Sequence, residues 1–420
     1  MTLPLDRHWK NIGCLLSVEA FWGVSLSLIS MVAVLPVFLR QLGATNTVIG
    51  VLPIVWLLTA NFSGLFAAHF TGNLTHRKRA VLLLHVVAAI PYLALAAWFW
   101  GVARPAGWMD ITALLVGWGL SWVIMGFTIP IWINFIGKVT RPELRARSFG
   151  VIFFSQTLFG AIGGWIGSRV LGTGLPFPMN YAFGFLIAAV AMAAGALFFL
   201  PVREEAGTTT EPGRAFSTIV KTAGEILRSR GGIRVYLAIL VLSVGRFLLI
   251  TYYPVYAEDK FALLHRDSAL YTAVFMAGQM LGSIFTGMIG DRFGYSRVAL
   301  IAMAALTLGL GLAIFGNNPA FYFATAFTLG IFFVADVLAL FNLSMGFSPH
   351  EDNTAYLGII PALVTPITAL AAGSSGSFID HFGFIPVAWV GLVGAAVALY
   401  LALFHLPEPA YSPARRREAT

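Results

Sequence analysis

The feature that most constrains this chain is a series of apolar runs, each long enough to cross a lipid bilayer. An α-helix needs about 20 apolar residues to span the hydrocarbon core, where no water satisfies exposed backbone groups. Only helices and closed barrels meet that condition, and these runs are far too long for barrel strands. The chain is 58% hydrophobic and 10% charged, whereas a soluble domain is roughly a quarter charged. We therefore expect an all-α membrane protein.

Hydropathy and helix-breaking residues predict twelve transmembrane helices. Their expected ranges are 11–38, 48–71, 80–101, 110–135, 149–171, 180–201, 233–257, 268–289, 298–316, 320–345, 355–379 and 386–406. Apolar residues recur at helical spacing in the longest connection, which predicts an amphipathic helix on the membrane surface. The expected organisation is an N-terminal six-helix bundle (1–201), a cytoplasmic linker (202–232), a C-terminal six-helix bundle (233–406) and a cytoplasmic tail (407–420).

The basic residues are distributed unevenly between the two sides of the membrane. With the N-terminus inside, the inner segments hold 20 of the 26 Lys and Arg residues, the outer loops hold five, and Arg246 lies in span seven. This bias predicts that both termini are cytoplasmic, in a bacterial-type inner membrane. The net charge of +8 then reflects orientation, so we expect a lipid bilayer and no nucleic acid as a partner. The lone Cys14 allows no disulfide within the chain, and we expect no metal, no cofactor and a monomer.

The two halves of the sequence echo each other. SVEAF at 17–21 matches SVGRF at 243–247, and Asn61, Gly64 and Asn73 match Gln279, Gly282 and Asp291 at one constant offset. GMIGDRFGY at 287–295 recurs as GSFIDHFGF at 376–384, three spans later and therefore on the other side of the membrane. Repeats that are parallel between halves and inverted within a half are typical of secondary transporters with alternating access.

One of these repeats carries a family resemblance. The pattern Gly287-x-x-x-Asp291-Arg292-x-Gly294 resembles the loop signature of the major facilitator superfamily, and the span count and long central loop extend the resemblance to nearly the whole chain. The loop after span two departs from the pattern, since Asn73 stands where the aspartate belongs. The resemblance implies two pseudo-symmetric six-helix bundles that rock around a central cavity. It also implies that spans one, four, seven and ten line this cavity.

Three normally charged residues lie well inside the predicted spans: Glu19, Arg246 and Asp336. A charge at the bilayer centre costs about 2.5–3.5 kcal/mol, so these residues should face a wet cavity or a partner. Glu19 fits a proton carrier or a ligand for a positive group. Arg246 fits an anchor for a carboxylate or phosphate, because guanidinium offers a planar fork. Asp336 fits a second protonation site or a partner of Arg246; a fixed Glu19–Arg246 pair and simple helix packing are the structural alternatives.

Uncharged side chains are weaker candidates for the same cavity. Gln156 and Gln279, in spans five and eight, fit either polar solute contacts or hydrogen bonds between helices. Trp22 and Trp122 fit stacking on an organic solute or packing toward lipid. We expect His85, early in span three, to be a packing residue.

The inner loops carry complementary charges that suggest a cytoplasmic gate. Its candidate residues are Asn73, Arg77, Arg79, Arg145, Arg147, Gly287, Asp291, Arg292, Gly294, Glu351 and Asp352. Family analogy makes these loops facing pairs that close the inner side in the outward-open state. Each such surface pair is worth only about 0–1 kcal/mol, so the pairs would bias that state without locking it.

No phosphate-binding loop of the GxxxxGK[ST] type is present, so a gradient must drive any active transport. We expect a secondary transporter and no enzyme, moving a small polar, anionic or zwitterionic organic solute with protons. Proton-driven efflux of amphipathic compounds and uncoupled facilitation are alternatives. Span five reads GAIGG at 160–164 without the Gly-Pro step of drug antiporters, which disfavours efflux. A lipid-modifying membrane enzyme is the alternative from another class, with its nearest polar cluster, HEDN, at 350–353.

Overall fold

A computed structural model describes residues 4–59, 61, 76–101, 107–141, 144–204, 216–229, 231–348 and 354–409. The side chains of 145–146, 216–219 and 354–357 are outside that description. Within these ranges the secondary structure is entirely helical. Eleven of the described helices are long and apolar enough to span a membrane. The shorter apolar helix 46–59 begins the remaining predicted span, whose continuation lies outside the described residues.

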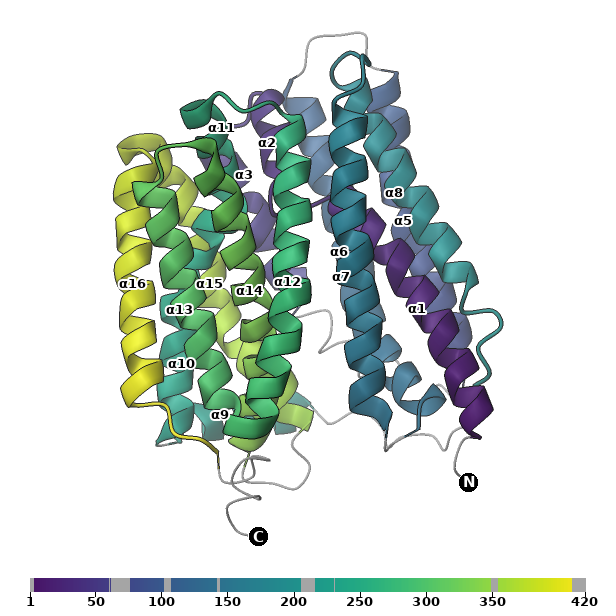
Figure 1. Cartoon of the computed structure of the whole chain (residues 1–420), viewed down its shortest axis with the longest axis vertical. Coiled ribbons are helices and arrows are strands. Elements are labelled where there is room, and N and C mark those ends of the chain that lie inside the picture. Colours follow the sequence, from purple (N-terminus) through teal and green to yellow (C-terminus); the bar gives the residue numbers. More distant parts are fainter. Residues whose placement is uncertain are drawn as a thin grey trace. The chain divides into compact units, whose positions relative to one another are not determined.

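The chain forms two compact units (Figure 1). Unit 1 comprises Met1–Ala44, Val55–Gly213 and Leu264–Ala273, and unit 2 comprises Thr45–Ile54, Arg214–Leu263 and Val274–Thr420. Each unit therefore includes one short segment that is flanked in sequence by the other unit. The segment 45–54 belongs to unit 2, although the chain enters it from unit 1 and returns there.

Unit 1 is built from paired long helices. They are α1 (Leu5–Leu28), α2 (Val34–Gln41), α5 (Lys78–Trp100), α6 (Trp108–Val139), α7 (Arg145–Leu171) and α8 (Met179–Leu197). The helix α1 packs along α7 and α8, and α5 packs along α6 and α8. Aromatic side chains fill the space between them, with Phe38 stacked on Tyr181 at 4.1 Å between ring centroids.

Unit 2 contains the start of the second predicted span, labelled α3 (Asn46–Ile49). It also contains the linker helix and most of the C-terminal spans. These are α9 (Phe216–Arg228), α10 (Gly232–Leu242), α11 (Tyr253–Phe261), α12 (Arg266–Phe293), α13 (Tyr295–Phe315), α14 (Pro319–Gly346), α15 (Thr354–Phe382) and α16 (Phe384–Phe404). The first turns of α12 lie in unit 1. In Figure 1, α13 stands between α14 and α16, which it contacts along much of its length.

The first span is not the single helix that the hydropathy predicts over 11–38. It begins at Leu5, stops at Leu28, and resumes as α2 at Val34 after a turn. Pro36 has no N–H to donate and its ring clashes with the preceding helical turn, so a continuous helix is broken just before it. The turn is held locally, because the Val32 N–H donates to Ser30 Oγ at 3.1 Å.

Two equivalent carboxylate caps show the internal repeat in three dimensions. In unit 1, the backbone N–H groups of Arg77 and Lys78 donate to the Glu204 carboxylate at 2.8–2.9 Å. In unit 2, the N–H groups of Tyr295 and Ser296 donate to Glu408 at 3.0 and 2.8 Å. Each carboxylate lies just after the last helix of its half and satisfies N–H groups that a helix start leaves unpaired.

The predicted linker helix is present as α9, which packs against α15. On this helix Ile226 is buried, whereas Val220, Leu227 and the charged Lys221 are exposed. An exposed apolar surface beside basic groups is typical of a helix lying at a membrane interface, so the surface location stays our prediction.

Candidate functional site

Glu19 lies on α1 in the interior of unit 1, with 4% of its surface exposed. Gln156 on α7 donates from Nε2 to Glu19 Oε2 at 2.6 Å. This contact depends on a close approach of the two helices at Gly23, where a Cβ atom would lie 2.1 Å from the Gln156 carbonyl oxygen. Two further hydrogen bonds join the helices, from Ser27 Oγ to the Gly160 carbonyl at 2.6 Å and from Ser155 Oγ to the Leu16 carbonyl at 2.9 Å.

Trp22 lies one helical turn beyond Glu19 and is also buried. Its ring meets the edge of His85 on α5 at 5.2 Å, and His85 in turn meets Phe199 at 4.9 Å. His85 Nδ1 donates to the Val81 carbonyl at 2.7 Å, one turn back on the same helix. The structure therefore gives His85 the aromatic packing that the sequence predicted. The buried Trp22 Nε1–H has no hydrogen-bond partner among the described residues, which leaves it available to a polar ligand atom.

Trp122 belongs to a tryptophan cluster in the same unit. Its ring centroid lies 5.9 Å from that of Trp118 and 6.2 Å from that of Trp56. Trp118 is fully buried on α6. The three indoles form an apolar, polarisable surface of the kind that can pack against an organic ring.

Arg246 lies at an irregular point in span seven. The helix α10 ends at Leu242, a 3₁₀ turn follows at Ser243–Gly245, and a π-helical segment runs from Leu248 to Tyr252 before α11 begins. The predicted span over 233–257 is present as one candidate membrane span, Gly232–Phe261, with this irregular stretch inside it. Short 3₁₀ and π segments inside long helices often mark functional positions. Here they flank Arg246, the one arginine that the sequence places well inside a predicted span.

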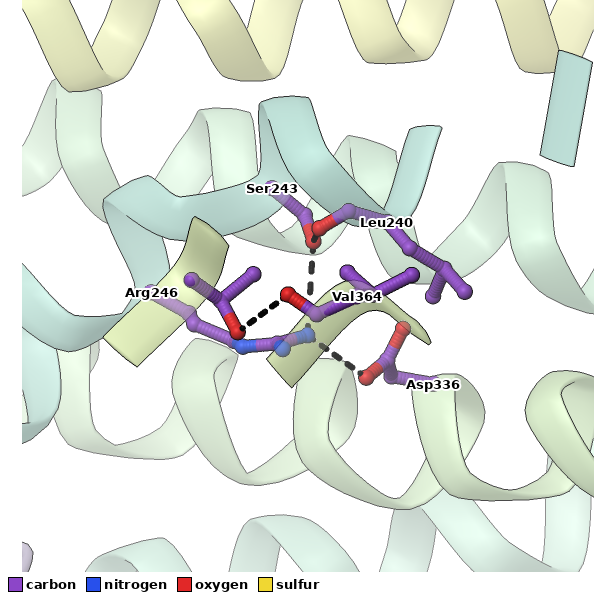
Figure 2. A network of polar contacts seen from close by, with 6 residues as sticks. Leu240, Ser243, Arg246, Asp336 and Val364 are labelled. Carbon is purple, nitrogen blue, oxygen red and sulfur yellow. Dashed lines mark hydrogen bonds and ion pairs between the residues drawn. The ribbon is translucent and has the colours of Figure 1, made fainter. Parts of the chain in front are cut away.

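Arg246 forms an ion pair with Asp336 of α14 inside unit 2. The guanidinium Nη1 donates to Asp336 Oδ2 at 3.0 Å and to Ser243 Oγ at 3.3 Å (Figure 2). The two side chains are only 14% and 15% exposed. On α15, the Thr368 hydroxyl donates to the Val364 carbonyl at 3.1 Å and to the Thr365 carbonyl at 3.2 Å. Of the sequence alternatives for Asp336, the structure contains the pairing with Arg246.

With respect to the described residues, Arg246 has spare hydrogen-bonding capacity. A guanidinium carries five N–H donors, and the two bonds above both use Nη1. Asp336 Oδ1 likewise stays outside the ion pair. The site can therefore bind a second anionic group at the same arginine, or exchange Asp336 for it.

Tyr236, on α10, is a polar neighbour that our sequence analysis did not single out. It is 1% exposed, and its hydroxyl has no hydrogen-bond partner among the described residues. The charges of Asp336 and Arg246 both act on this hydroxyl. Tyr236 lies seven residues, or two helical turns, before Ser243. This spacing is the sequence signal that could have identified Tyr236 as a neighbour of the site.

The remaining cavity candidate, Gln279, is half-buried on α12 and makes no side-chain hydrogen bond within the described part of the chain. Its helix meets α14 closely, because a Cβ at Gly330 would lie 2.9 Å from the Gln279 backbone nitrogen. Gln156 and Gln279 thus differ in the structure: one bonds a buried carboxylate, and the other does not.

Only some of the candidate gate residues lie among the described residues. Asn73, Glu351 and Asp352 lie outside the described residues, as does the side chain of Arg145. Arg79 and Arg147 are exposed, whereas Arg77 is buried at the helix start that Glu204 caps. Asp291 accepts a hydrogen bond from Tyr295 at 3.2 Å, and Arg292 lies over the ring of Phe293. Gly294 has a φ of +92°, which a glycine adopts without strain between α12 and α13.

A helical membrane protein whose two units each hold a carboxylate well inside a span has the features of a secondary transporter. The family model of the Major Facilitator Superfamily matches residues 16–266 and 235–420. The chain therefore belongs to the major facilitator superfamily, a family of membrane transporters.

Individual relatives are distant. The chain is 26% identical over 382 residues to the class G tetracycline resistance protein of Vibrio anguillarum, which covers 87% of this chain and 90% of that protein. It is 27% identical over 179 residues to the cis,cis-muconate transport protein of Acinetobacter baylyi, and 23% identical over 174 residues to the quinolone resistance protein NorA of Staphylococcus aureus. These two matches span only 42% and 45% of those relatives.

Solved structures show the same fold. A D-xylose–proton symporter superposes with a TM-score of 0.70 at 13% identity, covering 96% of this chain and 98% of the symporter. A POT family transporter in complex with 5-aminolevulinic acid gives a TM-score of 0.72 at 15% identity, with 94% and 96% coverage. The twelve-helix, two-bundle architecture expected from the sequence is consistent with both.

Proposed function

We propose that the chain is a proton-coupled secondary transporter of a small organic anion or zwitterion that carries a carboxylate. The observation that carries this proposal is the Arg246–Asp336 ion pair, withdrawn from solvent beside a break in span seven. Arginine recognises a carboxylate through parallel N–H donors, and spare donors remain on this guanidinium. The resemblance to a cis,cis-muconate transport protein supports the same solute class, because muconate is a dicarboxylate.

Asp336 and the solute compete for Arg246 in this mechanism. While Asp336 is ionised, it neutralises the arginine and holds the site closed to other anions. Protonation of Asp336 removes its charge, so Arg246 becomes free to bind the carboxylate of the solute. Loss of the proton restores the ion pair and expels the solute, which links the two binding events through one guanidinium.

Glu19 is the proposed second proton site, in unit 1. Its carboxyl is buried and, within the described part of the chain, has one hydrogen bond, from Gln156, and no countercharge. A desolvated carboxyl with a neutral donor as its partner can hold or release a proton without breaking an ion pair. We propose that Glu19 carries a transported proton and that both termini face the cytoplasm at an inner membrane.

Efflux of an amphipathic compound is the second candidate. The match to a tetracycline resistance protein over most of the chain favours it, as does the indole cluster around Trp122. The same charged residues would then drive exchange of protons for an outgoing compound. Transport of cis,cis-muconate and of tetracycline, measured in parallel, separates the two candidates.

The test is uptake by purified protein in proteoliposomes, with and without a pH gradient. We expect cis,cis-muconate to accumulate only with the gradient, and Glu19→Gln to abolish accumulation while still allowing equilibration. Arg246→Ala should weaken solute binding at least about 30-fold, because losing a buried charged partner costs ~2–5 kcal/mol. Glu225→Gln, on the exposed face of α9, is the control and should behave as the parent. Gradient-driven accumulation by Glu19→Gln, or normal binding by Arg246→Ala, would refute the respective assignment.

A further inference from the structure

Two buried hydroxyl groups of unit 2 lack a hydrogen-bond partner within the described part of the chain. In a helix such a group ordinarily bonds its own backbone, and Thr325 and Thr328 of α14 donate to carbonyls one turn back, at 2.8 and 3.1 Å. Ser344, further along the same helix, is fully buried and makes no such bond. The hydroxyl of Tyr236 is likewise buried and unpartnered among the described residues. Buried polar groups without a partner are costly and rare, so we expect these two hydroxyls to bind a further molecule.

Tyr236 and Ser344 lie toward the same end of unit 2. The start of α10 is beside the end of α14, because a Cβ at Gly232 would lie 2.6 Å from the ring of Phe347. The centroid of that ring is 6.4 Å from the centroid of the Tyr236 ring. Ser344 comes about one turn before Phe347 in the chain. The two unpartnered hydroxyls therefore belong to side chains near one phenylalanine.

Span seven connects this end of unit 2 to the ion pair. Tyr236, Leu240 and Ser243 recur at helical spacing and share one face of the span. The Ser243 hydroxyl donates to the Leu240 carbonyl at 2.9 Å and accepts from Arg246 (Figure 2). The donor of Ser243 is therefore used, and Tyr236 carries the next polar side chain along that face. Because the charges of Asp336 and Arg246 both act on the Tyr236 hydroxyl, it lies within electrostatic reach of the pair.

Size and polarity decide what these hydroxyls can bind. Both side chains are closed to solvent, so an organic solute does not reach them in this conformation. Water is small enough to enter a polar gap, and it binds where two to four polar groups surround it. The hydroxyls of Tyr236 and Ser344 are such groups, and so is the Oδ1 atom of Asp336, which stays outside the ion pair. The ligand that fits is therefore water.

We propose that Tyr236 and Ser344 hold bound water that carries protons between Asp336 and the adjacent end of unit 2. A proton that enters at this end binds the oxygen of a water or hydroxyl, which passes its own proton to the next oxygen. The last transfer forms the O–H bond of the Asp336 carboxylic acid, so Arg246 loses its negative partner. No electrons are exchanged, and release of the proton follows the same steps in reverse. This use of the water rests on the proposed transport function.

This path differs from the route of the solute. The solute reaches Arg246 from the side on which the ion pair is exposed, 14% for Arg246 and 15% for Asp336. Tyr236 is closed to solvent, so a solute bound at the arginine leaves the water beside Tyr236 in place. Competition between Asp336 and the solute requires that Asp336 lose its proton while the solute still occupies Arg246. A separate path for the proton makes that step possible.

The bound water is tested by X-ray radiolytic labelling of the purified protein, without solute or gradient. Radiolysis of bound water oxidises a tyrosine ring that lies against it, whereas a dry, buried ring stays unlabelled. We expect Tyr236 to be labelled severalfold faster than Tyr322, which is equally buried near the other end of α14. Ser344→Ala should slow the labelling of Tyr236, because it removes a partner of the water. Thr328→Val, which removes a hydroxyl already bonded to its own helix, is the control and should not. Equal labelling of Tyr236 and Tyr322 would overturn the water site.

The proton path is tested by infrared difference spectra recorded as the pH is lowered. The C=O band that is lost in Asp336→Asn reports protonation of Asp336. We expect a water O–H band, identified by its shift in isotope-labelled water, to change together with this C=O band in the parent and in Tyr322→Phe, and to be lost in Tyr236→Phe. A water band that persists in Tyr236→Phe would overturn the path. A parent without the C=O band would refute the proton step of the proposed function, whereas the labelling of Tyr236 would still decide whether water is bound.

Discussion

At the scale of single residues, the two units give a carboxylate inside a span different partners. Asp336 has a full countercharge in Arg246 at 3.0 Å. Among the described residues, the Glu19 carboxyl has only the amide of Gln156 as its partner, at 2.6 Å. A carboxylate beside a fixed cation is stabilised in its ionised form, whereas one beside a neutral donor is less so. The pair therefore suits competition with an anion, and the lone carboxyl suits proton uptake.

Removing one partner of the Arg246–Asp336 pair should destabilise the protein more than removing both. Asp336→Ala leaves the Arg246 guanidinium without its ion-pair partner. Breaking a fully buried pair costs about 3–5 kcal/mol, and we expect the lower end here because both side chains are partly exposed. The double variant Arg246→Met/Asp336→Leu should recover most of that loss. The midpoint of thermal unfolding in detergent measures both effects.

Asp291→Ala is the control for this series. Asp291 is exposed and bonds only Tyr295 among the described residues, so its removal should change the unfolding midpoint little. An Asp336→Ala protein as stable as the control would mean that the pair contributes nothing to the fold.

At the scale of helices, small residues decide which spans can touch. The backbones of α1 and α7 come into contact at Gly23. This close approach brings Gln156 within hydrogen-bonding distance of Glu19. Lipid tails are as apolar as the side chains, so packing of this kind, together with hydrogen bonds, holds transmembrane helices together.

Gly23→Ala should separate α1 from α7. The added Cβ would lie 2.1 Å from the Gln156 carbonyl oxygen, a backbone atom that cannot swing aside. We expect a loss of about 1–3 kcal/mol in stability, as for other overpacked positions, together with weaker gradient-driven transport. Gly13→Ala on the same helix meets nothing within 4 Å and should be neutral or slightly stabilising. Equal unfolding midpoints for the two variants would contradict this account of the contact.

At the scale of the whole molecule, the two halves of the chain contain equivalent structural elements whose contacts differ. Glu204 and Glu408 cap equivalent helices, each from the end of its own half. Of the motif copies at 287–294 and 376–383, the second contacts a distant segment at Asn46 and Thr47. Asp291 of the first copy bonds only Tyr295 among the described residues. Sequence repetition supplies equivalent groups, and the conformation determines which of them are in contact.

The caps provide a test of the repeat. Glu204→Gln and Glu408→Gln should each speed amide hydrogen exchange at the helix start that the carboxylate serves, residues 77–81 and 295–299. The effect should be larger for Glu204, which is 2% exposed and lies 3.9 Å from Lys138, than for the half-buried Glu408. Loss of a cap costs about 0.5–2 kcal/mol. Exchange that changes in one half only would show that the two caps are not equivalent.

The sequence by itself determined the helical membrane class, nearly all span positions and the three isolated charges, because hydropathy and charge are properties of local stretches. It also indicated an internal repeat between the two halves of the chain. Only the tertiary structure decided that Glu19 meets Gln156, that Arg246 meets Asp336, and that the segment 45–54 belongs with unit 2. A span that is apolar on every face carries no periodic signal for its neighbours. The rotation and register of each helix are set instead by close approaches between residues far apart in the chain. Examples are the approach of Gly23 in α1 to α7 and of Gly376 in α15 to the start of the second span.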